Sequence, residues 1–383
     1  PRLWAREKLD GTLSQNIVRP GVNVFGHFSY PSGLRISSES LIKGLQQNNF
    51  EVSVRDVPVS FDTDDPISFH FNGTELFETT IIHVQPEPFF QTLYDRAGLS
   101  TRGKSNYRVG YWYWELEEIP SAWNRAALDC DEIWTATEYI AAGLRRRFRQ
   151  PIHVLNPGIE IEDFQLMPRS HFAIPKDQYT FCYVFHMASM MERKNPLALI
   201  RAFKQAFGHN ASAGLIIKIS CGHHYPEELR KLYEAAKDAN ITILDQVFTR
   251  DETLSLVSQC DAYVSPHRSE GLGLTMAEAM LLGRPVIATR YSGNLDFMND
   301  SNSLLVECRM TALDRDVGPY KAGQHWADPS IEHASELMRR LFDDRDFGRK
   351  LGADARTDLK TRLNYRHKGR AIADRLNAIS RLV

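Results

Sequence analysis

The chain has 383 residues, which is longer than most domains with a single hydrophobic core, so we expect two or three domains. Hydrophobic residues make up 43% and charged residues 25%, which is the balance of an ordinary globular protein. The formal net charge of -2 argues against a nucleic-acid-binding protein, so a bound anion would have to be held by a local site.

The cysteines and the apolar runs indicate the cellular compartment of the protein. None of the five cysteines forms a Cys-x-x-Cys pair, and most lie in apolar runs, which indicates reduced, buried core residues of a cytosolic protein. No apolar run is long enough to span a bilayer, and no signal peptide opens the chain, so we expect a soluble, cytoplasmic protein. The chain begins at Pro1, which leaves open whether a methionine was removed or a longer protein was cut.

Short apolar segments alternate with helical patterns through the first half of the chain. Residues 1–20 look like a polar leader or linker. One helix should start near Ser37 and another should end in the basic run Arg145–Arg147. The alternation predicts a parallel sheet covered on both faces. Its strands are expected over residues 22–26, 51–54, 79–84, 107–112, 132–135 and 152–155.

The pattern breaks at Asn156-Pro157-Gly158, and a polar, proline-containing linker runs to Asp177. A second alternating series follows, with a helix capped by Asn195 and opened by Pro196, and roughly the last 50 residues favour helix throughout. The sequence therefore predicts two α/β domains that face each other across a cleft. Strands of the second domain are expected over residues 181–185, 215–219, 241–244, 262–264 and 285–288.

The most informative segment follows the strand that ends at Val264. A loop contains Gly271 and Gly273, and a helix opens near Thr275. Free amides and the helix dipole favour an anion at such a helix start, and glycines allow a ligand to approach the backbone. The combination suits a phosphate or diphosphate.

Two glutamates flank this loop. Glu270 precedes the helix and Glu278 lies one turn inside it, and carboxylates accept hydrogen bonds from sugar and ribose hydroxyls well. Spacing alone leaves alternatives open. Thr275 and Glu278 match a capping box, and Glu270 is compatible with a solvated loop residue.

A second candidate site is Lys194, which comes directly before a predicted helix start. A cation at this place can neutralise a leaving diphosphate, although a solvated loop lysine is an equally good interpretation of the position alone.

The spacing Glu270-x7-Glu278, with its surrounding residues and the following Gly283–Ala288, resembles the signature of the retaining GT-B glycosyltransferases of family 4 (group 1). The likeness covers residues 180–306, including Ser292-Gly293-Asn294 and 302–306, and residues 154–160 resemble the family's interdomain hinge. It implies two Rossmann-like domains over 1–165 and 166–360, and a C-terminal helix over 361–383 that crosses back to the first domain.

The same resemblance implies roles for single residues. Glu270 would contact the transferring sugar, Glu278 would hold the ribose, and the amides around Leu274 and Thr275 would cradle the distal phosphate. Lys194 would neutralise the leaving diphosphate. By the same comparison the configuration of the sugar is retained, and a nucleotide-sugar serves as co-substrate with no metal or other cofactor.

This sequence departs from the family at two places. The arginine usually found five residues before the lysine is Ser189 here, and the neighbouring Arg193 is the candidate replacement. Many members place a histidine after the strand at 107–112. None is present there, and Trp114 or Glu115 occupies about that place, with Glu115 as a candidate ligand of a hydroxyl and core packing or solvation as the alternative.

A weaker echo is the turn Tyr30–Leu34, which resembles the glycine loop near the donor phosphates and makes Gly33 a candidate donor contact, with an ordinary turn as the alternative. Other signals are set aside. Four scattered Asp-x-Asp triplets lack the strand context of a metal site, so we expect no catalytic metal, and His223-His224 lacks further ligands for zinc. The run Arg145–Arg149 is a candidate contact for anionic lipids at the inner membrane face or simply a solvated helix end.

We therefore expect a hexosyltransferase-type enzyme that moves a sugar from a nucleotide-diphosphate donor to a hydroxyl of a glycan or lipid-linked acceptor in polysaccharide biosynthesis. No nucleic-acid partner is expected. Two alternatives remain open: a nucleotide-sugar epimerase or hydrolase on the same fold, and a non-catalytic partner subunit. Donor sugar, base, acceptor and oligomeric state are not readable from the sequence.

Overall fold

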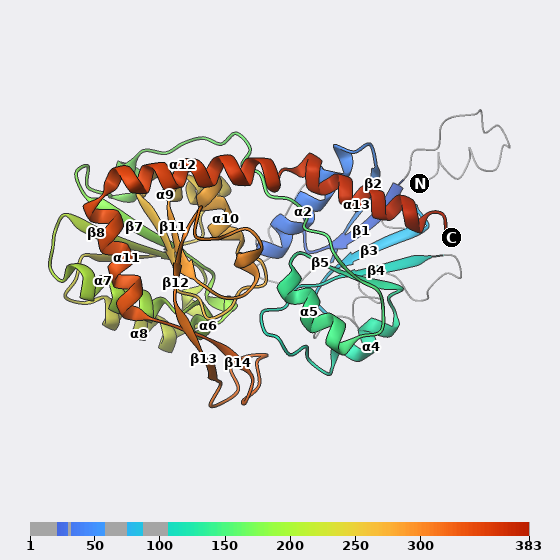
Figure 1. Ribbon diagram of the computed structural model, residues 1–383, viewed down its shortest axis with the longest axis horizontal. Coiled ribbons are helices and arrows are strands. Elements are labelled where there is room, and N and C mark those ends of the chain that lie inside the picture. Colours follow the sequence, from blue (N-terminus) through green and yellow to red (C-terminus); the bar gives the residue numbers. More distant parts are fainter. Residues whose placement is uncertain (1–20, 30–31, 58–74, 87–105, 383) are drawn as a thin grey trace.

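The computed structural model describes residues 21–29, 32–57, 75–86 and 106–382. The predicted leader, Tyr30 and Pro31 of the predicted turn, and the Asp-x-Asp triplet at 62–64 lie outside these ranges. The described residues form two α/β domains side by side, joined along one edge by the helices of the C-terminus (Figure 1).

The first domain is built on a six-stranded sheet in which every pairing is parallel. The strand order is β2-β1-β3-β4-β5-β6, and all the strands expected from the sequence are present within two residues of their expected ends. They are β1 (Gly21–Gly26), β2 (Glu51–Asp56), β3 (Thr79–His83), β4 (Tyr107–Tyr111), β5 (Glu132–Thr135) and β6 (Ile152–Val154).

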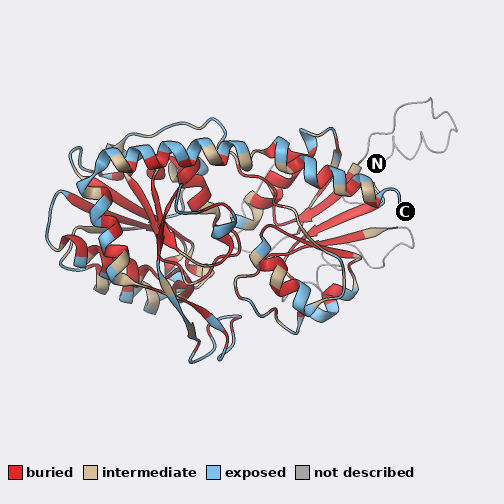
Figure 2. Ribbon diagram, in the orientation of Figure 1, coloured by how far each residue is buried: buried red, intermediate tan, exposed pale blue. Residues whose placement is uncertain are grey.

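The second domain has a parallel six-stranded sheet of order β12-β11-β10-β7-β8-β9. Counted within the domain this is 3-2-1-4-5-6, the order of dinucleotide-binding sheets, read from β9. Every residue of β7 and β8 is buried, as expected for strands covered on both faces (Figure 2). The strands are β7 (Tyr179–Val184), β8 (Ala213–Ile219), β9 (Ile241–Asp245), β10 (Ala262–Ser265), β11 (Val286–Thr289) and β12 (Leu304–Val306).

Helices connect the strands and cover the sheets. Those of the first domain are α2 (Gly33–Gln46), α4 (Trp123–Leu128) and α5 (Glu138–Arg147). Those of the second domain are α6 (Met191–Lys194), α7 (Pro196–Phe207), α8 (Pro226–Ala236), α9 (Arg250–Gln259), α10 (Leu274–Leu281) and α11 (Ile331–Asp343). Helix α12 (Arg345–Arg362) and helix α13 (Tyr365–Ile379) follow.

Two helix starts differ from the expectation. Helix α2 begins at Gly33 rather than near Ser37, because the Ser32 hydroxyl accepts a hydrogen bond from the Arg35 amide and caps the helix earlier. Asn195 precedes α7 as expected, but it lies in the left-handed region at φ 57°, and its side chain donates to the Pro266 carbonyl (3.0 Å) rather than capping the helix.

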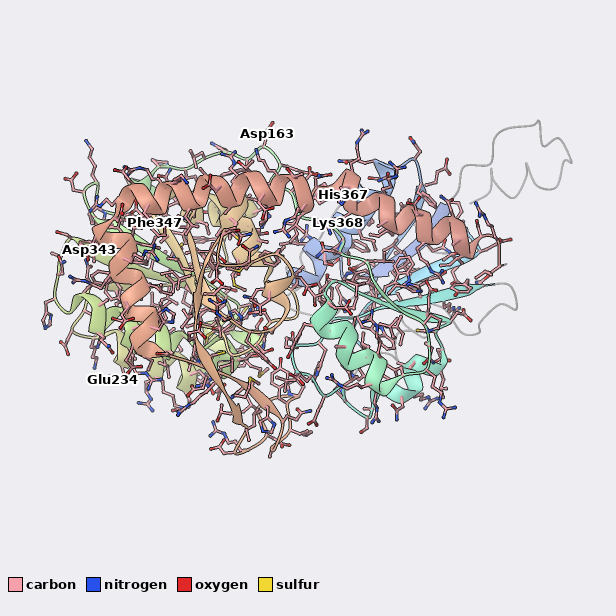
Figure 3. All side chains as sticks on the ribbon, viewed as in Figure 1. Asp163, Glu234, Asp343, Phe347, His367 and Lys368 are labelled. Atoms are coloured by element: carbon pink, nitrogen blue, oxygen red, sulfur yellow. The ribbon has the colours of Figure 1, made fainter. Side chains whose placement is uncertain are left out.

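The C-terminal helices cross both domains, as the family resemblance implied. Helix α12 lies along the second domain, where Arg340 stacks on Phe347 at 4.0 Å, and α13 continues over the first domain, with His367 in its first turn (Figure 3). Helix α13 packs on α2 so closely that a Cβ on Gly369 would lie 2.2 Å from the Gly44 carbonyl oxygen. The chain therefore crosses between the domains a second time and returns to the first.

The crossing points meet at the predicted hinge. The Ile159 amide donates to the Leu363 carbonyl (2.7 Å), and the Tyr365 amide donates to the Glu160 carboxylate (2.6 Å). Gly158, at φ 86°, lies against Leu363 and Tyr365. The two connections thus run beside each other and form one hinge.

A hairpin of β13 (Cys308–Ala312) and β14 (His325–Pro329) was not expected from the sequence. It lies between β12 and α11 in the chain and projects downward from the second domain in the view of Figure 1.

Candidate active site

The topology of the second sheet explains where a site forms. Strands β7 and β10 are neighbours, and the strand order reverses between them. In open parallel sheets, ligands bind at the carboxyl ends of the strands at such a reversal. The loop after β7 leads to Lys194, and the loop after β10 leads to Glu270. Two candidate residues from distant parts of the sequence therefore meet at one edge.

Lys194 and Glu270 form a close ion pair, with Nζ 2.5 Å from Oε1. Burial would raise the pKa of Glu270, but the charges of Lys194, Arg193 and His267 outweigh it and hold that pKa at about 2. Burial lowers the pKa of Lys194, an effect that Glu270 partly offsets. The pair places a carboxylate and an ammonium together. The carboxylate can accept hydrogen bonds from hydroxyls, and the ammonium can contact phosphates.

Arg193 is buried, and acceptors surround its guanidinium. It donates to the Ser269 carbonyl (2.9 Å) and lies 3.3 Å from Glu270 and 3.8 Å from Glu115. Its backbone carbonyl also accepts from the Arg268 amide (2.7 Å). This geometry suits holding Glu270 in place, and the donor contact expected of Arg193 as a replacement for the family's arginine stays a prediction.

The glycine loop ends at the start of α10. Gly273 lies in the left-handed region at φ 88°, and the helix begins with Leu274. The first amide that bonds back is that of Met276, to the Gly273 carbonyl (3.1 Å), so the preceding amides of Leu274 and Thr275 have no position to bond to within the helix. The capping-box alternative is wrong, because the N-cap is Gly273 and Thr275 already lies inside the helix.

The backbone around Glu270 is fixed from the neighbouring loop. The Glu270 amide donates to the Ser292 hydroxyl (2.8 Å), and the Gly293 amide donates to the Glu270 carbonyl (2.9 Å). A Cβ on Gly293 would lie 2.0 Å from the Gly271 carbonyl oxygen, so only glycine fits. The Ser-Gly pair quoted from the sequence thus supports the backbone that carries Glu270.

Gly271 lies at the boundary between the domains. A Cβ there would lie 3.1 Å from the Trp114 carbonyl oxygen, and the Gly271 carbonyl accepts from the Thr137 hydroxyl (2.8 Å). Close packing of the first domain is therefore one physical reason for a glycine at this position.

Glu278 is buried in α10 and pairs with Arg250 at the start of α9, with the guanidinium 2.6 Å from Oε1. Arg250 is partly exposed, while the Glu278 side chain is nearly enclosed. A hydroxyl-bearing ligand reaching Glu278 would therefore meet Arg250 as well.

Glu115 reaches the site from the first domain. Its carbonyl accepts from the Tyr139 hydroxyl (3.0 Å) and the Ser269 hydroxyl, and its carboxylate accepts from the Tyr320 hydroxyl (3.0 Å). The structure thus brings Glu115, the candidate ligand of a hydroxyl, beside Arg193.

The remaining candidates lie at the edges. Gly33 faces the glycine loop from α2, since a Cβ on it would lie 3.9 Å from the Leu274 side chain. Ser189 ends a short 3-10 turn (Met187–Ser189), and its amide donates to the His186 carbonyl (2.9 Å).

The sequence interpretation missed a cluster at the carboxyl edge of the first sheet. The Ser37 hydroxyl lies 2.8 Å from Nε2 of His83 and 2.7 Å from the Tyr113 hydroxyl, and His83 stacks on Tyr111 at 4.7 Å. Its members come from α2, the end of β3 and the end of β4. His83 pairs with Gly26 at the end of β1, and the order of this sheet reverses between β1 and β3. The sequence feature that could have indicated this cluster is His83, which lies near the end of the expected strand 79–84.

The Tyr113 ring joins this cluster to the donor side, because its Cδ1 would lie 3.5 Å from a Cβ on Gly271. The histidine that many family members have after β4 is absent here, but His83 lies at the end of the neighbouring strand β3. Burial lowers the pKa of His83 to about 3, so the ring is neutral.

Three further sequence signals concern metal binding, membrane spans and the basic run Arg145–Arg149. Among the described residues, no group of three or more His, Cys, Asp or Glu is placed to hold a metal ion. No helix in that part of the chain is long and apolar enough to cross a membrane. In the basic run, Arg145 pairs with Glu138, Arg146 donates to the Glu117 carbonyl (3.0 Å) and Arg147 to Asn124 (2.9 Å).

The fold and a part of the second-domain sequence are similar to those of known proteins. Residues 180–314 match the family model described as glycosyl transferases group 1. A segment of 58 residues is 43% identical to an uncharacterized glycosyltransferase of Methanocaldococcus jannaschii, and it covers 15% of this chain and 16% of that protein.

Three solved structures superpose over almost the whole chain. HepE of Anabaena, crystallised with UDP and glucose, has 13% identity and a TM-score of 0.64, covering 94% of this chain and all of that one (100%). Sucrose-phosphate synthase of Thermosynechococcus elongatus has 15% identity and a TM-score of 0.67, with 95% and 100% covered. A glycosyltransferase of Rickettsia africae has 13% identity and a TM-score of 0.68, with 94% and 99% covered. The chain therefore has the GT-B fold, and residues 180–314 are similar in sequence to the group 1 glycosyltransferases.

Proposed function

We propose that the protein is a retaining glycosyltransferase that moves a hexose from a nucleotide-diphosphate donor to a hydroxyl of a glycan or lipid-linked acceptor. The observation that carries the proposal is the Lys194–Glu270 pair (2.5 Å) beside the glycine loop and the free amides at the start of α10. One site thereby offers a cation and amides for phosphate and a carboxylate for sugar hydroxyls.

The residues take roles according to their place. Glu270 accepts hydrogen bonds from the transferring sugar, and Glu278 accepts them from the ribose. Lys194 and the amides of Leu274 and Thr275 stabilise the charge that develops on the leaving diphosphate. A leaving phosphate oxygen takes the proton of the attacking hydroxyl, so the protein's task is to orient the partners and exclude water.

Uridine diphosphate is the first nucleotide to test, because HepE and other proteins of this fold were crystallised with UDP. We further propose that the reaction needs no metal and belongs to polysaccharide assembly in the cytoplasm, at the inner membrane face where the acceptor is lipid-linked.

The test is a thermal-shift screen of UDP, GDP, ADP and dTDP and their sugars, followed by turnover with the sugar nucleotide that stabilises most. A selective shift, acceptor-dependent release of the nucleotide in EDTA, and a product with the donor's anomeric configuration by NMR are expected. Release of free sugar or an epimer without any dependence on acceptor would contradict the transferase assignment.

A further inference from the structure

The β13–β14 hairpin carries a tyrosine into the candidate active site. Tyr320 is 3% exposed, and its ring packs on Trp114 of the first domain at 5.3 Å. A tight turn holds it, since the Val317 and Tyr320 amides donate to each other's carbonyls (2.9 and 3.0 Å). A Cβ on Gly318 in this turn would lie 2.6 Å from the Met190 sulfur, so the turn packs directly before α6.

The Tyr320 hydroxyl bridges the domains. It donates to Oε2 of Glu115 (3.0 Å), whose other oxygen lies 3.8 Å from Arg193, and Arg193 in turn lies 3.3 Å from Glu270. A chain of contacts thus runs from the hairpin, through a first-domain carboxylate, to the carboxylate that pairs with Lys194.

Neighbouring contacts reinforce this bridge. Gln324, at the end of the same loop, donates to the Glu118 carbonyl (3.4 Å), and the Trp114 indole donates to the same carbonyl (2.9 Å). The Ser269 hydroxyl donates to the Glu115 carbonyl next to the site. The hairpin and the loop of Glu270 therefore hold the same first-domain segment.

We propose that Tyr320 is a positioning residue, which holds Glu115 against Arg193 and so couples closure of the two domains to the orientation of Glu270. This inference rests on the proposed function. With Glu115 in place, Arg193 shares its charge between two carboxylates, and Glu270 stays available to Lys194 and the sugar. When the domains separate, Glu115 leaves with the first domain and Arg193 turns wholly to Glu270. The sugar site is then assembled only in the closed form, which protects the donor from water.

The test uses the full chain with Tyr320→Phe, Glu115→Gln and the double variant. A matched control is Tyr107→Phe, which removes another tyrosine-to-glutamate hydrogen bond, to Glu132 (3.1 Å), at the amino-terminal end of β4. Loss of one hydrogen bond to a charged group should lower kcat for transfer about tenfold, with KM for the donor changed less than threefold. The double variant should be no slower than Glu115→Gln alone, because both changes break one contact.

Small-angle scattering of the unliganded proteins gives a readout that needs no activity. Tyr320→Phe should have a larger radius of gyration than the wild type, and Tyr107→Phe should match the wild type. Unchanged kcat in Tyr320→Phe, or an unchanged radius of gyration, overturns the inference. If the wild type turns over no sugar nucleotide, the proposed function fails, and the scattering result alone decides whether Tyr320 closes the domains.

Discussion

Nζ of Lys194 lies 2.5 Å from Oε1 of Glu270, although 76 residues separate them in the chain. The two loops that carry these residues are also joined by the side-chain amide of Asn195, which donates to the Pro266 carbonyl (3.0 Å), and by the backbone amide of Arg268, which donates to the Arg193 carbonyl (2.7 Å). The two loops are therefore held together by hydrogen bonds at the residues on either side of Lys194, which limits how far the pair can separate.

Replacing Lys194 by alanine should lower kcat about a hundredfold or more, because a preorganised cation at a leaving group contributes on this scale. Glu270→Gln should also lower turnover, since the amide removes the charge that accepts sugar hydroxyls. Nucleotide release under saturating donor and acceptor measures both effects.

The control is Lys237→Ala, which breaks a lysine–glutamate pair of similar length (2.6 Å, to Glu234) on the exposed surface. It should leave turnover unchanged. Equal activity of Lys194→Ala and Lys237→Ala, with both proteins folded by thermal unfolding, would show that Lys194 has no part in the reaction.

The architecture was predictable from the sequence because it depends on local patterns. Apolar strands alternate with amphipathic helices, and this repeats on both sides of the linker at 156–177, so two parallel sheets follow. The glycine loop before α10 was predictable for the same reason. Glu270 and Lys194 could be paired in advance only through family resemblance, because their contact depends on the reversal of strand order between β7 and β10.

Tyr320 could not be found from the sequence. Its hydrogen-bond partner Glu115 lies 205 residues away, and β13 of the hairpin that carries Tyr320 has no fully buried residue, so it forms no apolar run in the sequence. The predicted start of α10 near Thr275 is confirmed within one residue, since the helix begins at Leu274. Only the capping-box alternative is wrong, because the N-cap is Gly273, at φ 88°, and Thr275 lies inside the helix.

Glu278→Gln should weaken binding of a nucleoside diphosphate about tenfold, because one charged hydrogen bond to the ribose is lost. The diagnostic measurement is calorimetry with UDP and with its 2′,3′-dideoxy analogue. The wild type should prefer UDP, and the variant should bind the two compounds nearly equally.

Arg250→Ala separates this effect from damage to the ion pair, since it breaks the 2.6 Å contact with Glu278 and leaves the carboxylate in place. It should retain the preference for UDP. A Glu278→Gln protein that still discriminates against the dideoxy compound would place the ribose elsewhere.

Gly369→Ala should lower the free energy of unfolding by about 1–3 kcal/mol, as overpacking does at a backbone contact. The added Cβ would lie 2.2 Å from the Gly44 carbonyl oxygen and 2.6 Å from the Gly44 Cα, so α13 would have to move away from α2. Urea unfolding followed by tryptophan fluorescence measures the change.

Gly348→Ala is the matched control in the neighbouring helix. Its Cβ would meet the end of the Leu341 side chain at 3.2 Å, which can shift, and alanine favours helix over glycine. This variant should be neutral or slightly more stable than the wild type. Equal losses in the two variants would mean that the α2–α13 contact contributes nothing special to stability.

His83 should make the fold sensitive to acid. Burial lowers its pKa from 6.5 to about 3. At a pH between these values, the ring is protonated in the unfolded chain and neutral in the folded protein. The unfolded state therefore binds more protons between these two values, and stability falls as the pH drops below 6.5. Linkage gives a loss of about 1.4 kcal/mol between pH 7.5 and 5.5 from this residue.

His83→Gln removes the titrating ring and keeps a polar group near the Ser37 hydroxyl, which lies 2.8 Å from Nε2 in the wild type. Its free energy of unfolding, measured in urea at pH 7.5 and 5.5, should therefore fall by about 1.4 kcal/mol less than that of the wild type. The exposed His209 provides the control, and His209→Gln should follow the wild type. Parallel losses in the wild type and His83→Gln would show that His83 accepts a proton in the folded protein about as readily as in the unfolded chain, and that the cluster with Ser37 and Tyr113 is open to water.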